Sequence, residues 1–432
     1  MINKTTTKGV LSVAAVALLL AVCISPIFVD EADAAGDGTI YLRPGDTYKW
    51  TPTFNIEKSR ITLTVNVSTS TTAGSFSNTS TAGGVTATVN SDKTVSVEVA
   101  SGTAISTVYV KVKATVTTGV SQEFTANMTV KVVNPTITYK TVNTYQGGTV
   151  SVSPAIYNAS IDSKTVTYTA TDLPSGLSCN KSTGEIFGTV TSSVTANTYS
   201  VTVRGTVATD PQQTFSTSFD IVVAKSMSLT APGDQYTAKG IAKTVTLSGT
   251  NTTSDTKWAI TSGSATGISM STATGTSGKI SVATNTDAGT YTVGYSATNP
   301  TSGQKVIGSV KITVGSVSID SISTSGGYVG SVTQLYSKTG TAATFTVSAT
   351  STPNLGLTLS KSGTNADIVT ISGQTISVAS SVAAGTYTFT ITETQASTGA
   401  TASKNITLIV DPVLEITNSV TSGSLTMKGA GD

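Results

Sequence analysis

The side chains that most often carry catalysis are scarce in this sequence. It contains no histidine, which excludes Ser-His-Asp and Cys-His mechanisms and zinc sites of the H-E-x-x-H type. Cys23 lies in the apolar N-terminal segment, so Cys179 would be alone in the mature chain, which excludes a zinc ribbon, a redox pair and an intrachain disulfide. A pair of carboxylates could still hydrolyse a glycosidic bond, but the acidic residues are dispersed at turn positions. We therefore predict that the protein is not an enzyme, and that Cys179 packs as a small apolar residue or, alternatively, pairs between chains.

The composition is typical of ordered β-structure with an uncharged surface. Hydrophobic residues make up 38% of the 432 residues and charged residues only 11%, against about 25% charged residues in an average soluble protein. Thr and Ser alternate with Val and Ile, and β-branched residues of this kind favour a pleated, half-exposed surface. The net charge is +2 and the basic residues are scattered singly. We therefore expect no nucleic-acid partner.

The first 35 residues have the order of a secretory signal. Lys4 and Lys8 precede an apolar run over 10–24, and Ala32-Asp33-Ala34 offers small residues for cleavage. The run is shorter than the ~20 residues that a membrane-spanning helix needs. We predict a signal helix that is removed on export, and an extracellular or cell-surface location. An uncleaved segment would be the one link to a membrane.

Two sets of landmarks recur with a period of about ninety residues, as expected for tandem domains. The first is a glycine followed by an aliphatic and a hydroxyl residue, and the second is a tyrosine that opens an alternating apolar run. Short period-2 segments separated by turn residues surround both landmarks, which is typical of a sandwich of about seven strands. The triplets begin at Gly84, Gly176, Gly267 and Gly356, and the tyrosines are Tyr109, Tyr199, Tyr291 and Tyr387.

The third tyrosine lies in a segment that resembles the tyrosine corner of immunoglobulin domains. Residues 287–293 read Asp-Ala-Gly-Thr-Tyr-Thr-Val, so Tyr291 should donate a hydrogen bond to nearby backbone. Val293 then occupies the place of the second cysteine of an antibody domain. Trp258 fits the buried aromatic residue of strand C, and Tyr168 takes that place in the second repeat. We predict that these aromatic residues form cores in which packing replaces a disulfide.

The second repeat shows a closer resemblance. Residues 172–178 read Asp-Leu-Pro-Ser-Gly-Leu-Ser, residues 182–189 read Ser-Thr-Gly-Glu-Ile-Phe-Gly-Thr, and residues 198–203 read Thr-Tyr-Ser-Val-Thr-Val. This pattern resembles the "putative Ig" or dystroglycan-type cadherin-like repeat over roughly 170–203. The other repeats keep only the two landmarks. The resemblance implies extracellular β-sandwich modules of surface, adhesive or envelope proteins.

Some members of this family bind calcium at domain junctions, and calcium needs six to eight oxygen ligands. The candidates in the second repeat are Asp172, Glu185 and Asp210, which form no visible cluster in the sequence. Among the four repeat junctions, only Val410-Asp411-Pro412 carries an acidic residue. We therefore expect no cofactor, with calcium as a weak alternative.

The sequence thus predicts an all-β fold: four tandem immunoglobulin-like β-sandwich domains after an N-terminal signal helix. The predicted parts are the signal peptide 1–35, domains at 36–134, 135–225, 226–315 and 316–411, and a tail at 412–432. The segment 411–417 copies the opening of the second repeat at 134–139, so the tail resembles the first strand of a further domain. We leave three interpretations open: a dangling end, a strand folded back on the fourth domain, or a strand that pairs with an exposed edge of a neighbouring molecule and links copies head to tail.

These observations favour an exported structural or adhesion protein, a rod of immunoglobulin-like modules that contacts proteins, the cell envelope or other copies of itself. A carbohydrate-binding array is one alternative, but it would need exposed aromatic pairs, and aromatic residues make up only 6% of the chain. A calcium-stiffened, cadherin-like adhesin is another. An envelope-associated enzyme would need a buried carboxylate pair, and none stands out.

Overall fold

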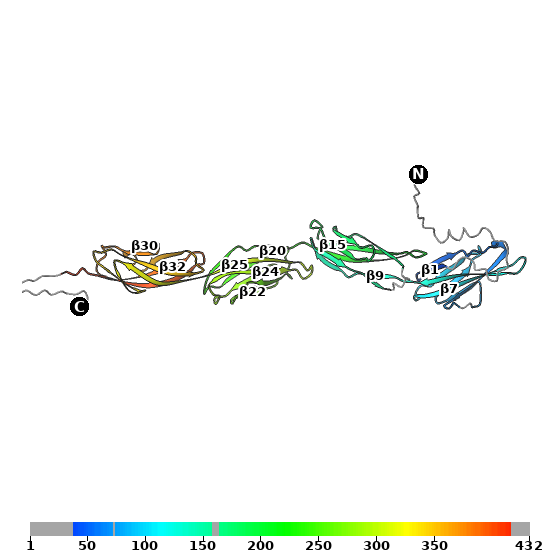
Figure 1. Cartoon of the computed structure of the whole chain (residues 1–432), viewed down its shortest axis with the longest axis horizontal. Coiled ribbons are helices and arrows are strands. Elements are labelled where there is room, and N and C mark those ends of the chain that lie inside the picture. The colour runs from blue at the N-terminus through cyan, green and yellow to red at the C-terminus, as the bar shows by residue number, and fades with distance from the viewer. Residues whose placement is uncertain (1–37, 72–73, 158–163, 416–432) are drawn as a thin grey trace, which may run out of the picture. The chain divides into compact units, whose positions relative to one another are not determined.

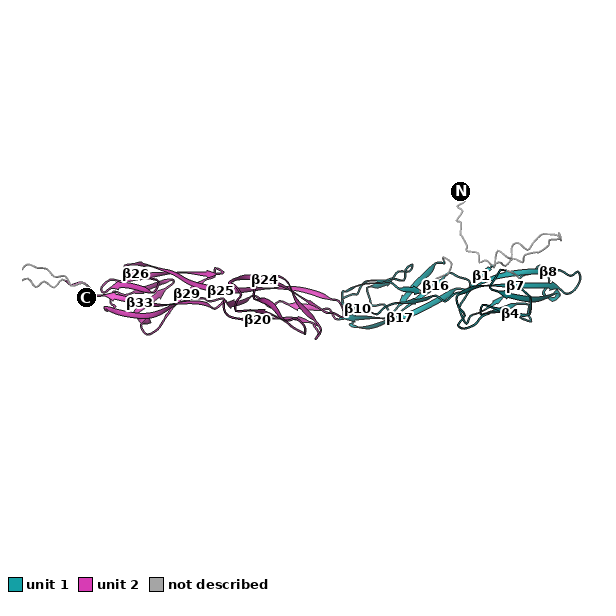
Figure 2. Ribbon diagram, turned by 90° about the horizontal axis from the view of Figure 1, so that it is seen from below, with its two compact units in different colours: residues 1–224 teal, residues 225–432 magenta. Residues whose placement is uncertain are grey.

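The computed structural model describes residues 38–71, 74–157 and 164–415. The predicted signal helix and all but the first four residues of the predicted tail lie outside the described residues. The described part consists of β-strands and turns, with two short 3-10 turns at Lys58–Arg60 and Ala366–Ile368 and no α-helix (Figure 1). The chain divides into two compact units, residues 1–224 and 225–432 (Figure 2).

The strands form because apolar and hydroxyl residues alternate with the period of a pleated chain. In β7 (Ser106–Val116), every second residue from Val108 onward is buried, and the residues between are half-buried. Its antiparallel neighbour β8 (Glu123–Val132) alternates in the same way. Because successive side chains of a strand point to opposite faces, this alternation fixes which face of the sheet packs on the core.

The first half of unit 1 is a sandwich of two four-stranded sheets, which we call sandwich 1. One sheet has the order β1-β8-β7-β3 and the other β2-β6-β5-β4. Its core extends in sequence from Ile40 to Val132 and includes Trp50. The remaining strands are β1 (Gly38–Leu42), β2 (Thr47–Trp50), β3 (Ile61–Ser68), β4 (Thr79–Ala82), β5 (Val85–Val89) and β6 (Val95–Val99).

The second half of unit 1, sandwich 2, has a core that extends from Val133 to Val223 and also takes in Tyr41. Its sheets have the orders β10-β17-β16-β13, β11-β15-β14 and β12-β9. The strands are β9 (Thr136–Thr138), β10 (Val142–Tyr145), β11 (Thr149–Val152), β12 (Ala155–Tyr157), β13 (Val166–Thr171), β14 (Leu177–Cys179), β15 (Ile186–Thr189), β16 (Asn197–Val207) and β17 (Gln213–Ala224).

Unit 2 begins with sandwich 3, whose core extends from Val245 to Val314. One sheet has the order β18-β20-β23-β22, and the other is built on β21-β24-β25 with β19 also paired to β25. The strands are β18 (Ser228–Thr230), β19 (Gln235–Ala238), β20 (Lys243–Thr250), β21 (Lys257–Ser262), β22 (Ile268–Thr272), β23 (Gly278–Val282), β24 (Gly289–Thr298) and β25 (Lys305–Ser325).

Sandwich 4 completes unit 2, with a core from Ile319 to Val410. Its sheets are β25-β28-β31-β30 and β26-β27-β33-β32-β29, so β25 belongs to both sandwiches of this unit. The strands are β26 (Tyr328–Ser331), β27 (Gln334–Lys338), β28 (Ala343–Thr352), β29 (Leu357–Ser362), β30 (Val369–Ser372), β31 (Thr375–Val378), β32 (Gly385–Gln395) and β33 (Ala400–Asp411).

All four sandwiches share one topological feature: a short strand near the start pairs in parallel with a long, later strand. The pairs are β1 with β8, β10 with β17, β19 with β25 and β27 with β33. The predicted all-β fold of immunoglobulin-like sandwiches is confirmed. We propose the boundaries 36–134, 135–225, 226–315 and 316–411 for the four domains, each with a core of its own.

The tyrosine corner is confirmed in sandwich 3 and is also present in sandwiches 2 and 4. Tyr291 donates a hydrogen bond from its hydroxyl to the carbonyl oxygen of Asp287, at 2.9 Å. Tyr199 and Tyr387 donate in the same way to the residue four positions earlier, at 2.8 and 2.9 Å. Trp258 is buried, as predicted, and its indole N–H donates to the carbonyl oxygen of Gly275 at 2.9 Å.

The equivalence of Tyr109 to these corners is wrong. In sandwich 3, Tyr291 lies opposite Ile312 on the face that turns toward the core. In sandwich 1, the residue opposite the corresponding Val130 is Val108, which is completely buried, while Tyr109 lies opposite Thr129 on the other face. Sandwich 1 therefore has a valine where the other sandwiches have the corner tyrosine.

Removing the corner hydroxyl should weaken each sandwich that has one. We expect Tyr291→Phe and Tyr387→Phe each to lower the free energy of unfolding of their own sandwich by about 1 kcal/mol, the usual net contribution of a hydrogen bond. Tyr109→Phe is the matched control and should change stability little. Hydrogen exchange followed by peptide mass spectrometry resolves the sandwiches, and equal effects of Tyr291→Phe and Tyr109→Phe would contradict the assignment.

Candidate interaction surfaces

The three predicted calcium candidates take part in three separate local contacts. Asp172, whose φ is 61°, accepts a hydrogen bond from the hydroxyl of Thr171 at 3.0 Å. Glu185 accepts one from the hydroxyl of Ser151 at 2.7 Å. Asp210 lies at the junction with sandwich 1, where its main-chain oxygen accepts the N–H of Tyr41 at 3.1 Å. Within residues 38–71, 74–157 and 164–415, no three acidic or cysteine side chains gather closely enough to hold a metal ion.

Calcium should therefore leave the stability of the protein unchanged. A ligand that binds only the folded state raises the unfolding temperature in proportion to the logarithm of its concentration. We expect the thermal unfolding curves of the whole chain to coincide in millimolar calcium and in a chelator. A rise in the unfolding temperature with calcium, lost in Asp172→Asn or Glu185→Gln, would show that these side chains form a site after all.

Cys179 lies on β14 and is half-buried. Burial raises the pKa of its thiol, and the sulfur makes one weak contact with the carbonyl oxygen of Asn180 at 3.8 Å. A thiol whose pKa is raised is protonated near neutral pH and is a poor nucleophile. This environment suits the predicted role of a small packing residue.

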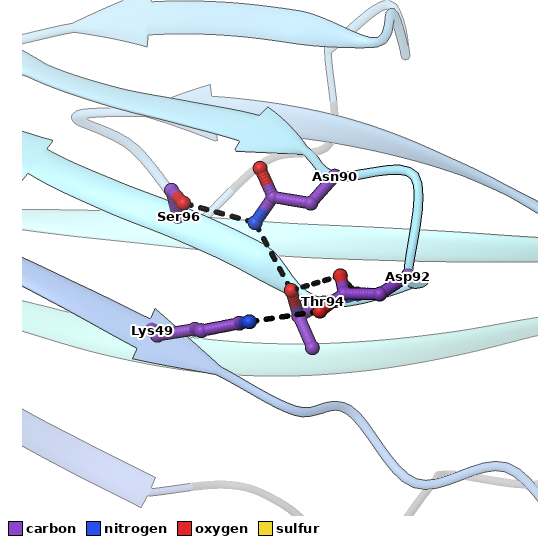
Figure 3. A network of polar contacts seen from close by, with 5 residues as sticks. All are labelled: Lys49, Asn90, Asp92, Thr94 and Ser96. Carbon is purple, nitrogen blue, oxygen red and sulfur yellow. Dashed lines mark hydrogen bonds and ion pairs between the residues drawn. The ribbon is translucent and has the colours of Figure 1, made fainter.

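A polar network closes the turn between β5 and β6 of sandwich 1 (Figure 3). Asp92 accepts hydrogen bonds from the ammonium group of Lys49 at 2.8 Å and from the hydroxyl of Thr94 at 2.5 Å. These bonds hold the pKa of the Asp92 carboxyl well below its ordinary value. Asn90 donates to Thr94 at 3.0 Å and to Ser96 at 2.9 Å. The network fixes the loop that carries Lys93, which points to a structural role.

The junction between sandwiches 1 and 2 is held by side chains of both. The guanidinium group of Arg43 donates to the carbonyl oxygens of Thr214 at 2.7 Å and Pro135 at 3.0 Å. Gln213, which is buried, donates its amide N–H to the carbonyl oxygen of Tyr41 at 2.7 Å. Tyr41 belongs by sequence to sandwich 1 but packs in the core of sandwich 2. Together these contacts fix the junction.

An open pocket of about 760 Å³ lies beside this junction. Arg43 and Arg204 both line it, together with Phe215 and a row of threonine and serine residues. Guanidinium groups bind carboxylates well, but Arg43 already donates to two carbonyl oxygens. The arrangement therefore favours a structural role for Arg43.

The junction between sandwiches 3 and 4 is a continuous strand. Residues 305–314 of β25 pair with β24 in sandwich 3, and residues 316–325 pair with β28 in sandwich 4. Gly315 lies between the two halves, where an added Cβ would overlap the side chains of Gln395 and Thr398. Gln395 is completely buried and donates to the carbonyl oxygen of Pro353 at 2.8 Å. The glycine thus lets sandwich 4 pack directly against the shared strand.

A small groove of about 130 Å³ lies at the edge of sandwich 1, where β2 ends. Among its lining residues are Phe54 and Ile56, which are half-buried against the core, and Lys58 and Lys93. In the part of the chain that the structure describes, no strand pairs with residues 51–57. This groove was not predicted from the sequence, although the pattern Thr-x-x-x-Ser/Thr-Pro, shared by residues 47–52 and 149–154, could have indicated it.

Residues 129–224 match the family model described as a putative Ig domain, which confirms the resemblance of the second repeat. Among solved structures, Drosophila N-cadherin EC1-4 is 13% identical over 86% of this chain and 99% of that one, with a TM-score of 0.23. The N-terminal eight Ig domains of Down Syndrome Cell Adhesion Molecule are 14% identical over 89% and 49%, with a TM-score of 0.35.

The human Desmocollin-1 ectodomain is 12% identical over 90% of this chain and 85% of that one, with a TM-score of 0.23. None of these likenesses is close enough to assign a function. No curated protein matches the chain. Within the described ranges, the structure contains no helix long and apolar enough to cross a membrane.

Proposed function

We propose that this protein is an exported, extracellular or cell-surface structural protein that makes its contacts with proteins or the cell envelope through a series of immunoglobulin-like sandwiches, and that it is not an enzyme. The observation that carries this proposal is the way the sandwiches are joined. β25 passes from sandwich 3 into sandwich 4 as one strand of 21 residues. At about 3.3 Å per residue, this strand is about 70 Å long.

A joint made of one continuous strand resists bending here, because Gln395 and Thr398 of sandwich 4 pack directly against Gly315 between the two paired halves. The junction in unit 1 is also occupied by specific contacts, those of Arg43, Gln213 and Tyr41. A binding protein that closes around its ligand needs a hinge at its junctions. Fixed junctions instead suit a spacer that holds binding surfaces apart.

The exposed faces of the sheets are lined by hydroxyl groups that pair across strands. Thr202 bonds to Ser218 at 2.9 Å, and Thr392 bonds to Ser403 at 2.8 Å. Such pairs stabilise neighbouring strands without placing charge on the surface. A neutral, hydroxyl-rich surface of this kind is compatible with an extracellular protein that contacts other surfaces at few points.

Surface labelling of intact cells tests the proposal. In cells that produce the full chain, we expect a membrane-impermeant amine reagent to label its lysines without lysis, and the mature protein to begin at Gly36. A cytoplasmic protein in the same cells is the control and should be labelled only after lysis. Labelling of this protein only after lysis, with residues 1–35 retained, would contradict the proposal.

A further inference from the structure

Sandwiches 2, 3 and 4 each begin with a strand that pairs with a later strand of the same sandwich. This opening strand follows closely after the last strand of the sandwich before it. In sandwich 2, β9 pairs with β12 in antiparallel fashion. In sandwich 3, β18 pairs with β20, and in sandwich 4 the second half of β25 pairs with β28.

The corresponding acceptor position in sandwich 1 can be located residue by residue. Ile40 pairs in parallel with Val130 as Val142 does with Ile221, and Thr47 begins the next strand as Thr149 does. Both comparisons give the same register without a gap. The segment 53–55 of sandwich 1 therefore corresponds to β12, the strand that pairs with the opening strand of sandwich 2. This is the segment that lines the groove with Phe54.

The same register shows that the chain's own sequence supplies a poor opening strand for sandwich 1. The positions that correspond to β9 hold Ala34, Ala35 and Gly36, next to the predicted signal cleavage site. In sandwich 2 the central residue of this strand is Ile137, which is 3% exposed in the core. Alanine at that place would leave most of the volume of an isoleucine side chain unfilled.

The segment that follows β33 has the features of an opening strand. The chain leaves sandwich 4 at Pro412, and the next two residues, Val413 and Leu414, are 49% and 62% exposed. Aligned on Pro135 and Pro412, Leu414 takes the place of the buried Ile137. Asp411 and Glu415 flank these residues, while the groove of sandwich 1 carries Lys58 and Lys93. The two surfaces are therefore complementary both in apolar character and in charge.

We propose that residues 412–417 of one copy of this chain add to sandwich 1 of a second copy as its opening strand. The register of β9 on β12 places Glu415 opposite Thr53, Leu414 opposite Phe54 and Val413 opposite Asn55. Main-chain hydrogen bonds supply the affinity in strand addition of this kind, and alternate side chains fill pockets. Each copy offers one donor and one acceptor, so the contact is heterologous and joins copies head to tail. This proposal concerns self-assembly of the purified protein, and its test does not depend on whether the protein is exported.

Site-specific cross-linking tests the contact in the chain from 36 to 432 with Cys179→Ser. Directly opposed residues of an antiparallel pair lie about 4.5 to 5.5 Å apart at Cα, which a disulfide can span. A copy with Thr53→Cys mixed with a copy with Glu415→Cys should form a covalent heterodimer under mild oxidation. The off-register pair Asn55→Cys with Glu415→Cys is the matched control and should react several-fold more slowly.

A second test places the change at Leu414 in a synthetic peptide, so that the folding of the protein is not altered by the substitution. A synthetic peptide of residues 411–418 should bind a chain that lacks 412–432, and the same peptide with Leu414→Glu should not bind. Equal cross-linking of the matched and off-register pairs, or peptide binding that ignores Leu414→Glu, would overturn the proposal. An internal disulfide within monomers of a Thr53→Cys, Glu415→Cys double variant, with no covalent dimer, would overturn it as well.

Discussion

Replacing Gly188 with alanine is expected to unfold sandwich 2 or to lower its free energy of unfolding by about 3 kcal/mol or more. Gly188 lies on β15 with φ of 131°, a conformation that L side chains rarely adopt. It pairs with Leu177, and an added Cβ would overlap the carbonyl oxygen of Gly176. An added Cβ at Gly176, whose φ is 95°, would likewise overlap the carbonyl oxygen of Thr189. The backbones therefore approach so closely at these two positions that neither has room for a side chain.

Gly147 offers a matched control in the same sandwich. Its φ is 84°, but no atom lies within 4 Å of the position of an added Cβ. Gly147→Ala should therefore cost only the conformational strain of about 1–2 kcal/mol. Hydrogen exchange of peptides from 164–224 measures sandwich 2 without interference from the other three. Equal losses of protection in the two variants would show that the close backbone approach does not matter.

This geometry gives a physical reason for the sequence pattern that identified the second repeat. The glycine of the Leu-Pro-Ser-Gly-Leu segment and the glycine of the Ile-Phe-Gly-Thr segment are the two residues that approach each other where β14 begins beside β15. A third glycine of the pattern, Gly184, accepts the hydroxyl of Tyr139 at 2.5 Å, and the ring of Tyr139 stacks on Phe219 at 4.5 Å. The pattern thus records backbone contacts rather than a binding site.

Features that depend on local alternation could be predicted from the sequence. The strand segments, the buried Trp258 and the corner at Tyr291 follow from period-2 patterns and one short motif, because the side-chain direction in a strand alternates regardless of what it packs on. The strand order within each sheet, such as β1 beside β8, depends on contacts between distant residues. No local pattern encodes these contacts.

One member of each set of landmarks, Tyr109 and the triplet at Gly356, was wrongly assigned because the sequence is so repetitive. Tyr109 is one residue out of register, and a shift of one residue places a side chain on the opposite face of the sheet. Gly356-Leu357-Thr358 leads into β29, which pairs with β32, whereas the other three triplets lead into strands of the opposite sheet. In those three, the glycine has positive φ, and Gly356 does not. In a sequence dominated by threonine, serine, glycine and valine, such triplets also arise by coincidence.

Of the two surfaces in the proposed contact, only the segment 411–417 could be predicted from the sequence. The strand-like character of 411–417 is visible in the sequence, because it copies 134–139. The groove at 51–57 is not, because its lack of a paired strand among the described residues appears only once β2 is placed at the edge of its sheet. The role of Arg43 was likewise hidden, since its partners are main-chain carbonyl groups 92 and 171 residues away.

Sandwich 4 should lose stability as the pH rises above the ordinary range of a carboxyl group, because of Glu393. This residue lies on β32 in the row of core-facing side chains and is completely buried. Burial raises the pKa of its carboxyl above the ordinary value of 4.5, and a hydrogen bond from Gln374 at 3.4 Å lowers it only in part. Neither Oε1 of Glu393 nor Oε1 of Gln374 has a hydrogen-bond partner in the described residues.

A proton on Glu393 would let its carboxyl donate to an acceptor such as the Gln374 carbonyl oxygen, so the protonated form suits the folded state. Because the folded-state pKa is raised, the folded protein binds this proton more tightly than the unfolded chain does. The stabilisation is fully present below pH 4.5, is lost as the pH rises through the folded-state pKa, and does not change further above it. Stability therefore falls with rising pH over this window.

Glu393→Gln tests this assignment, because a carboxamide supplies a donor without ever ionising. At neutral pH we expect the variant to be more stable than the native chain by about 1 kcal/mol or more, the usual cost of leaving a buried polar atom unpaired. Below pH 4.5 the two should be nearly equal. Urea unfolding of sandwich 4 across this pH range, followed by hydrogen exchange of peptides from 316–411, measures the difference. The exposed Glu98 gives the control Glu98→Gln, and parallel pH curves for Glu393→Gln and the native chain would show that the Glu393 carboxyl is not the group that titrates.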